Sequence, residues 1–210
     1  MATHTGAATK ALGIGVASIL LGGALSGCGS SAVTGALNGT VAQKWVDFAT
    51  VLGDEDTVKQ TLPDPATMPG WKSHRKEVDE EDGSDEECQG CKLDGNVDFE
   101  AGSAKASFKI TTFATGTQAS AYLATAAQKA GKKASALSVT TVGNETTAYT
   151  GTFGSSTGNL ILMRVGTVFA GVLVTGPSDV PQLQKMATML ARRIEQTAAG
   201  QHADAALDTA

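Results

Sequence analysis

Two adjacent apolar stretches in the second half of the chain constrain its fold more strongly than any other feature. Residues 160–165 and 168–175 are almost continuously apolar, and only Gly166 and Thr167 separate them. A two-residue link that begins with glycine suits a type II′ turn, because the first position of that turn needs a positive φ. We therefore expect two antiparallel strands, joined as a hairpin, at the centre of a β-sheet.

Four further segments predict strands that extend this sheet. Residues 97–101 and 104–114 alternate small or apolar with polar residues around a short turn, which is typical of a hairpin with one covered face. Similar alternation in residues 137–141 and 148–153, around a turn at residues 142–145, predicts two more strands. Because the links between consecutive strands have hairpin length, we expect a mainly antiparallel sheet of about six strands.

Three segments have the apolar spacing of amphipathic helices. Apolar residues recur at intervals of three and four in residues 41–53, in residues 118–130 and in residues 183–194. Thr115 and Gln118 fit the spacing of a capping box before the second segment, and Ser178 or Asp179 can cap the third. Helices packed on one face of the sheet give a two-layer α+β fold, and we expect one such domain over residues 41–197. The Ala-rich residues 198–210 have nothing to pack and are expected to form a mobile tail.

Between the first helix and the sheet the sequence predicts mostly loop. A short helical turn ends at Leu62, since Pro63 cannot continue it. Eight of the eleven residues from 77 to 87 are acidic, and such a density of charge is typical of a solvated loop. A weak cation site or a basic partner is the alternative, although a calcium-binding loop centred on Gly83 would lack its ligands at both ends.

The N-terminal residues 1–27 have the layout of a secretory signal segment. Lys10 precedes an uncharged, mainly apolar run at residues 11–25. The alternative is an uncleaved membrane helix, which needs about 20 apolar residues, whereas this run is shorter and is interrupted by glycines. We therefore expect the segment to be removed during export.

Residues 25–28, Leu-Ser-Gly-Cys, fit the lipobox pattern and resemble the cleavage site of bacterial lipoprotein precursors. The resemblance implies cleavage after Gly27 and a diacylglyceryl group on the sulfur of Cys28, which becomes the first residue of the mature protein. Residues 28–40 then form its lipidated N-terminal segment. The small polar residues of that segment are typical of a flexible tether. The expected location is the extracytoplasmic face of the cell membrane, where the lipid on Cys28 holds the protein.

The charge of the chain limits its partners. It has 21 acidic and 16 basic residues and a net charge of −5. This balance argues against nucleic acid, since phosphate binding depends on clustered cations. It also argues against purely electrostatic adhesion to anionic lipid, so the membrane contact is expected to be the covalent lipid.

Cys88 and Cys91 are the two cysteines that remain after Cys28, and in an oxidising compartment we expect them to form a disulfide. A redox-active pair and half of a metal site are the alternatives. Redox activity requires a lowered thiol pKa near cations or a helix N-terminus, but acidic residues precede this pair. A zinc site needs four ligands, and His74 is the only histidine between Cys28 and the tail. We expect no metal and no cofactor.

Residues 154–158 match the G-x-S-x-G pattern of a hydrolase nucleophile elbow. An elbow needs a strand followed by a helix, with an acid and a histidine downstream, whereas a strand is expected next and only His202 follows. We therefore expect a non-catalytic lipoprotein that binds a small ligand or an envelope protein. The alternative is an envelope enzyme or redox protein that uses Cys88 and Cys91.

Four short features occur in a recognisable order: Pro-Gly-Trp at residues 69–71, the turn at residues 142–145, the hairpin around Arg164 and the closing helix. Over residues 57–197 they resemble the extracellular sensor-like domains of actinobacterial serine/threonine protein kinases and their lipoprotein relatives. The family's widely separated disulfide cysteines have no counterpart here. The resemblance implies a ligand cleft between the sheet and its helices.

Two residues near that expected cleft are candidates for contact with a ligand. Trp71 could stack on a ligand, or it could close the end of the core. Arg164 could hold an anion, or it could be a strand-end arginine that faces water. The sequence leaves these alternatives open.

Overall fold

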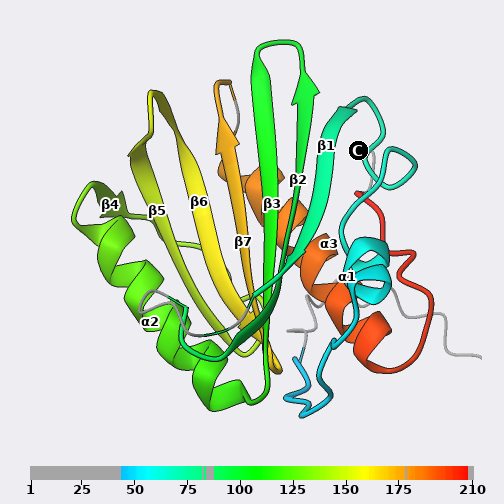
Figure 1. Ribbon diagram of the computed structural model, residues 1–210. Helices are drawn as coiled ribbons and strands as arrows, with labels where there is room; N and C mark the ends of the chain where they lie inside the picture. The colour runs from blue at the N-terminus through cyan, green and yellow to red at the C-terminus, as the bar shows by residue number, and fades with distance from the viewer. Residues whose placement is uncertain (1–43, 82, 84–87, 178, 208–210) are drawn as a thin grey trace, which may run out of the picture. The chain divides into compact units, whose positions relative to one another are not determined.

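A computed structural model describes residues 44–81, 83, 88–177 and 179–207. They form an antiparallel seven-stranded sheet in the order β1-β2-β3-β7-β6-β5-β4, together with three helices, so the expected α+β class is confirmed (Figure 1). The expected signal segment (residues 1–27), Cys28 and the expected tether lie outside the described residues. In chain order the elements are α1 (Glu55–Thr61), β1 (Lys72–Glu80), β2 (Cys91–Ala101), β3 (Ala104–Phe113), α2 (Gly116–Gly131), β4 (Ala134–Ala136), β5 (Glu145–Phe153), β6 (Ser156–Val165), β7 (Val168–Thr175) and α3 (Val180–Ala198).

The central hairpin is the one that the sequence predicts. β6 pairs with β7 from Gly158 opposite Thr175 to Val165 opposite Val168. Gly166 has a φ of 60°, which glycine adopts without the strain that a side chain would add. β7 also pairs with β3, so the hairpin lies inside the sheet.

The helices cover both faces of the sheet, which corrects the expected two-layer arrangement. Ile161 and Met163 of β6 belong to the main core with α1 and α3, whereas Leu162 between them packs in a second cluster with α2. Successive side chains of a strand point to opposite faces. α2 therefore lies on the face opposite α3, in front of the sheet in Figure 1, and the sheet is the middle of three layers.

Strand β1 was not expected, and it takes in the first part of the acidic segment. Residues 77–80 pair with β2, and Val78 is buried in the core. β1 is an edge strand, and charged side chains on an edge hinder pairing with another molecule. The prediction of a loop over residues 77–87 is therefore wrong for residues 77–80.

Residues 137–141 do not form the expected strand. The strand in this region is the short β4, and the chain beyond it finds its partner on α3: the Gln184 side chain accepts a hydrogen bond from Thr140 N (3.0 Å) and donates one to Thr140 O (3.0 Å). Leu137 and Val139 still pack against the main core. Leu137 N still donates to Ala148 O of β5 at 2.9 Å, but beyond Leu137 the alternation of side chains reflects burial on one side and not a strand.

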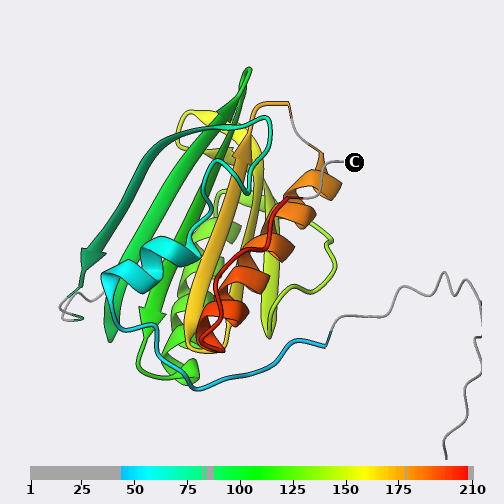
Figure 2. The same ribbon diagram turned by 90° about the vertical axis from the view of Figure 1, so that its right-hand side faces the viewer.

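The expected helix over residues 41–53 is absent from its described part, residues 44–53. This stretch, which we call the N-terminal strap, has no regular secondary structure and runs along the lower end of the domain (Figure 2). Its apolar residues pack on the main core: Leu52 is buried in it, and Trp45 and Phe48 are partly buried against it, with Phe48 beside Gly166. Their helix-like spacing therefore reflects burial against the core and not a helix.

The end of α1 is held by two cations from other elements. Arg193 of α3, 1% exposed, donates to the backbone carbonyls of residues 60, 61, 62 and 205 at 2.8 to 3.2 Å. Lys76 of β1 donates to the carbonyls of residues 59 and 62. Burial lowers the pKa of both side chains. The negative end of this short helix is thereby compensated.

Residues beyond α3 also pack, which corrects the expectation that they contact nothing. Ala203 is 4% exposed, and Leu207 N donates to Thr67 O at 2.8 Å. The Gln196 side chain binds the backbone of Asp204 and its carboxylate. Within the described part of the chain, no helix is long and apolar enough to cross a membrane.

Candidate functional site

An open pocket of about 680 Å³ lies where the N-terminal strap meets the start of α2 and the adjoining ends of β5 and β6. Among the described residues that line it, Arg164 is the only cation, and two carboxylates accompany it. The residues that line the pocket are Asp47, Phe48, Ala49, Gly116, Thr117, Ser120, Ala121, Ala124, Glu145 and Arg164.

The sheet itself places Glu145 beside Arg164. The two residues are direct partners in the β5–β6 register, and the first residue of β5 thus faces the next-to-last residue of β6. Directly opposed residues project from the same face of a sheet. Arg164 Nε donates to Glu145 Oε1 at 2.6 Å, and Ser120 Oγ of α2 donates to Glu145 Oε2 at 2.8 Å. Glu145 is therefore held by the sheet through Arg164 and by α2 through Ser120.

A second carboxylate reaches Arg164 from the strap. Asp47 accepts from Nη1 through Oδ1 at 2.8 Å and from Nη2 through Oδ2 at 3.3 Å. Nη1 also donates to Gly166 O at 2.9 Å. The side chain of Arg164 is 9% exposed, whereas that of Asp47 is 60% exposed. The Arg164–Asp47 ion pair therefore joins a buried guanidinium to a carboxylate that is exposed to water.

Electrostatics keep Arg164 charged. Burial lowers its pKa, but the hydrogen bonds to Asp47 and Glu145 outweigh burial, so the pKa is raised overall. A guanidinium held in this way presents fixed N–H groups in one plane, an arrangement that matches a carboxylate.

The wall formed by α2 is made of small residues close to the guanidinium. Thr115 caps the helix, with its side chain accepting from Gln118 N at 3.2 Å, as the sequence predicts. A Cβ on Gly116 would lie 3.3 Å from Arg164 Nη1, so the first turn of α2 approaches the arginine closely. Ala121 and Ala124 continue the wall and leave room above Arg164.

The described residues that line the pocket include few of the groups that covalent catalysis uses. None of these residues is His or Cys. The one serine of the described lining is Ser120, and its hydroxyl donates a hydrogen bond to Glu145. Across the described ranges, no group of three or more His, Cys, Asp or Glu side chains could hold a metal ion. Residues 154–158 span the β5–β6 turn and lead into a strand, which does not fit a nucleophile elbow.

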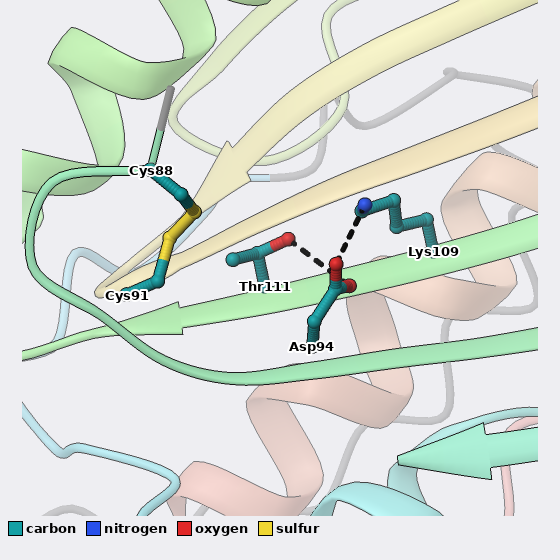
Figure 3. Close-up of a disulfide and its surroundings, with 5 residues drawn as sticks. All are labelled: Cys88, Cys91, Asp94, Lys109 and Thr111. Atoms are coloured by element: carbon teal, nitrogen blue, oxygen red, sulfur yellow. Dashed lines mark hydrogen bonds and ion pairs between the residues drawn. A yellow bond between two sulfur atoms is a disulfide. The ribbon is translucent and has the colours of Figure 1, made fainter. Parts of the chain in front are cut away.

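Cys88 and Cys91 are joined by a disulfide, with Cα atoms 5.5 Å apart (Figure 3). Cys91 is 1% exposed and belongs to the cluster under α2. Figure 3 also shows Asp94, which pairs with Lys109 at 2.7 Å. Burial lowers the pKa of Lys109, but the hydrogen bond to Asp94 and its charge outweigh burial and raise that pKa overall. Because Cys91 is the first residue of β2, its disulfide with Cys88 fixes the start of that strand.

The structure separates the two residues that the sequence singled out for a ligand. Trp71 is 8% exposed and belongs to the main core, which favours the alternative that it closes the core. Arg164 lines the pocket, and Trp71 does not. Sequence reasoning missed Asp47, Glu145 and Ser120. Only Glu145 had a usable signal, because extending the β5–β6 pairing to the end of β6 places it opposite Arg164.

Among solved structures, the chain is similar to the extracellular domain of PknH from Mycobacterium tuberculosis. The match covers 63% of this chain and 87% of that one, with 11% sequence identity and a TM-score of 0.41. No protein-family model matches the chain, and no curated protein matches it.

Proposed function

We propose that this protein is a lipid-anchored, extracytoplasmic binding module without catalytic activity, and that the pocket beside Arg164 is its ligand site. The observation that carries the proposal is the charged Arg164 guanidinium, 9% exposed, in the lining of an open pocket. Burying a charge is costly unless partners compensate for it, and here Glu145 and Ser120 provide a fixed network on one side.

The composition of the pocket supports binding. Ligand sites are typically concave and largely apolar, with a few polar groups that fix orientation. Here Phe48, Ala49 and the alanines of α2 supply apolar surface, and Arg164 supplies the orienting group. The pocket is built mainly on α2 and the sheet, so most of its shape is present without a ligand.

The location rests on the sequence and on the cysteines. Cys28 closes a lipobox after an apolar run, and the disulfide of Cys88 and Cys91 suits an oxidising compartment. Because a lipoprotein domain stays close to the membrane, a ligand from the envelope or the surrounding medium could reach the pocket.

The anchor is tested by replacing the cysteine that would carry the lipid. Wild-type protein should fractionate with membranes and show a diacylglyceryl mass on Cys28, since two acyl chains hold a protein stably on a bilayer. Cys28→Ala should lack that mass, whereas Cys88→Ala with Cys91→Ala should keep it. An unmodified Cys28 in mature wild-type protein would contradict the anchor.

The pocket is tested by native mass spectrometry of the protein isolated from its own envelope in detergent. We expect a bound ligand in the wild type and its loss in Arg164→Gln, with circular dichroism as a check that the variant is folded. Arg192→Gln removes the same charge outside this pocket and should retain the ligand. A ligand lost only with the Cys88 and Cys91 substitutions would favour the redox alternative.

A further inference from the structure

We propose that the pocket binds a carboxylate carried by a small apolar group, and that Asp47 occupies the carboxylate position while the pocket is empty. This inference rests on the proposed function, because it names the ligand class of the same site. In the structure the Asp47 carboxylate stands in for that ligand: its two oxygens accept from Nη1 and Nη2 of Arg164.

The hydrogen bonds of Arg164 divide into a fixed set and an exchangeable set. A guanidinium has five N–H donors in a rigid fork. Nε is committed to Glu145, and Nη1 also donates to the carbonyl of Gly166. Both of these partners belong to the central sheet and its turn. Asp47 accepts from the outer fork, where a bidentate carboxylate fits best.

Asp47 is the partner that can leave. Glu145 is part of β5 and also accepts from Ser120, whereas Asp47 lies on the strap, which has no hydrogen-bonded ladder or helix. Its side chain is 60% exposed, compared with 39% for Glu145. Water can therefore solvate the Asp47 carboxylate as it separates from Arg164.

Apart from Asp47, the strap up to Leu52 is held by two hydrogen bonds and by Trp45 and Phe48, which are partly buried against the main core. Val46 N donates to Glu195 Oε1 at 3.1 Å, and Thr167 Oγ1 donates to Thr50 O at 2.7 Å. Val46 is 64% exposed, and the first fully buried residue of the strap is Leu52, at 2%. The strap can thus lift from the pocket while Leu52 keeps its place in the core.

Charge and shape define the ligand class. With Glu145 retained, a monoanion restores the charge that Asp47 provides, whereas a dianion would add repulsion with Glu145. Ala121 and Ala124 of α2, which stay in place when the strap leaves, give apolar surface for a small substituent. Two sources offer this chemistry: a free short-chain acid and the C-terminus of a peptide.

The test measures the affinity of full-length protein in detergent for propionate and for N-acetyl-alanyl-alanine, with the amide of each as a control. Asp47→Asn removes the internal competitor, and Asp47→Ser is a second variant that does the same. Asp98→Asn removes one exposed carboxylate from β2, away from the pocket. If the strap is docked nine-tenths of the time, Asp47→Asn should bind the acid about tenfold more tightly than the wild type.

We expect Asp98→Asn to match the wild type, and neither amide to bind. The stronger of the two acids identifies the source of the carboxylate. Saturation of the wild type should also shift the emission of Trp45 to longer wavelength as the strap leaves, while buried Trp71 is unchanged. Asp47→Asn should show that shift without ligand.

Equal affinity of the wild type and both Asp47 variants would overturn the competition. Binding of the amides as tightly as the acids would overturn the carboxylate assignment. If no probe binds any variant but the native ligand still depends on Arg164, this inference fails and the binding function stands. If the native ligand does not depend on Arg164 either, both fail.

Discussion

Replacement of Arg193 should destabilise the domain strongly without touching the pocket. Its guanidinium donates four hydrogen bonds to backbone carbonyls, and those to Thr61 and Leu62 are fully buried. In Arg193→Met the apolar stem remains, but the carbonyl of Thr61 loses its partner inside the protein. The carbonyl of Leu62 keeps a hydrogen bond from Lys76 at 3.1 Å.

The size of the effect follows from these bonds. A hydrogen bond to a charged group contributes about 1.5 to 3 kcal/mol, and removing the guanidinium also ends the cost of burying its charge. We therefore expect Arg193→Met to lower the free energy of unfolding by about 3 to 4 kcal/mol. Arg193→Lys keeps the charge but replaces the planar fork with a single ammonium, so about half of that loss is expected.

The assay is urea denaturation followed by circular dichroism and tryptophan fluorescence, with the slope of the transition as a check for two-state behaviour. Arg192→Met is the matched control, since this neighbouring arginine is exposed on the same helix and should cost less than about 1 kcal/mol. Equal losses for the two methionine variants would refute the role assigned to the buried hydrogen bonds.

Three further outcomes can be measured in the same assay. Cys88→Ala with Cys91→Ala should cost about 2 kcal/mol, because so short a loop gains little from closure, and a complete loss of folding would contradict this. Trp71→Ala should cost about 3 to 5 kcal/mol and leave ligand affinity unchanged, since Trp71 packs in the core. Hydrogen bonds from Lys105 and His74 lower the pKa of Glu100, as those from Thr57 do for Asp54. A lowered carboxyl pKa stabilises the folded state above the ordinary carboxyl pKa of about 4, and this stabilisation is lost as the pH falls through the lowered pKa of the folded protein. The urea concentration at the unfolding midpoint should therefore decrease below pH 4.

The parts of the fold that the sequence predicts correctly have strong local signals. The β6–β7 hairpin has two apolar runs and a glycine at a position that needs positive φ. α2 and α3 have side-chain caps, Thr115 and Asp179, each of which accepts from a backbone N–H three residues later. Such features act within a few residues and can be read without knowing the tertiary structure.

The errors arise where a segment takes its structure from distant partners. β1 is rich in charge, and its pairing with β2 supplies the backbone hydrogen bonds that its own side chains do not predict. The strap has helix-like spacing but no regular secondary structure, and its apolar side chains Phe48 and Leu52 pack on the main core, with Phe48 against Gly166. The periodicity of apolar residues does not distinguish an amphipathic helix from an irregular segment that packs on the core at the same intervals.

The candidate site depends on contacts that are still more remote in sequence. Asp47 and Arg164 are 117 residues apart, and no spacing rule connects them. Glu145 and Arg164 are 19 residues apart and become neighbours only through the register of β5 and β6. Sequence analysis could therefore select Arg164 as a candidate, but it could not supply the partners that make Arg164 more than a surface arginine.

We assign different roles to the two buried arginines of the described domain, Arg164 and Arg193, because they bind different kinds of partner. Arg193 binds backbone carbonyls, which are fixed parts of the fold and cannot be exchanged for a ligand, and only that of Leu62 also accepts from Lys76 among the hydrogen bonds described above. Arg164 binds carboxylates, and one of them comes from an exposed side chain on an irregular segment beside an open pocket. Loss of Arg193 should therefore appear as lost stability, whereas loss of Arg164 should appear first as lost binding. If Arg164→Gln were as destabilising as Arg193→Met and left the native ligand bound, the pocket would have to be assigned a structural role instead.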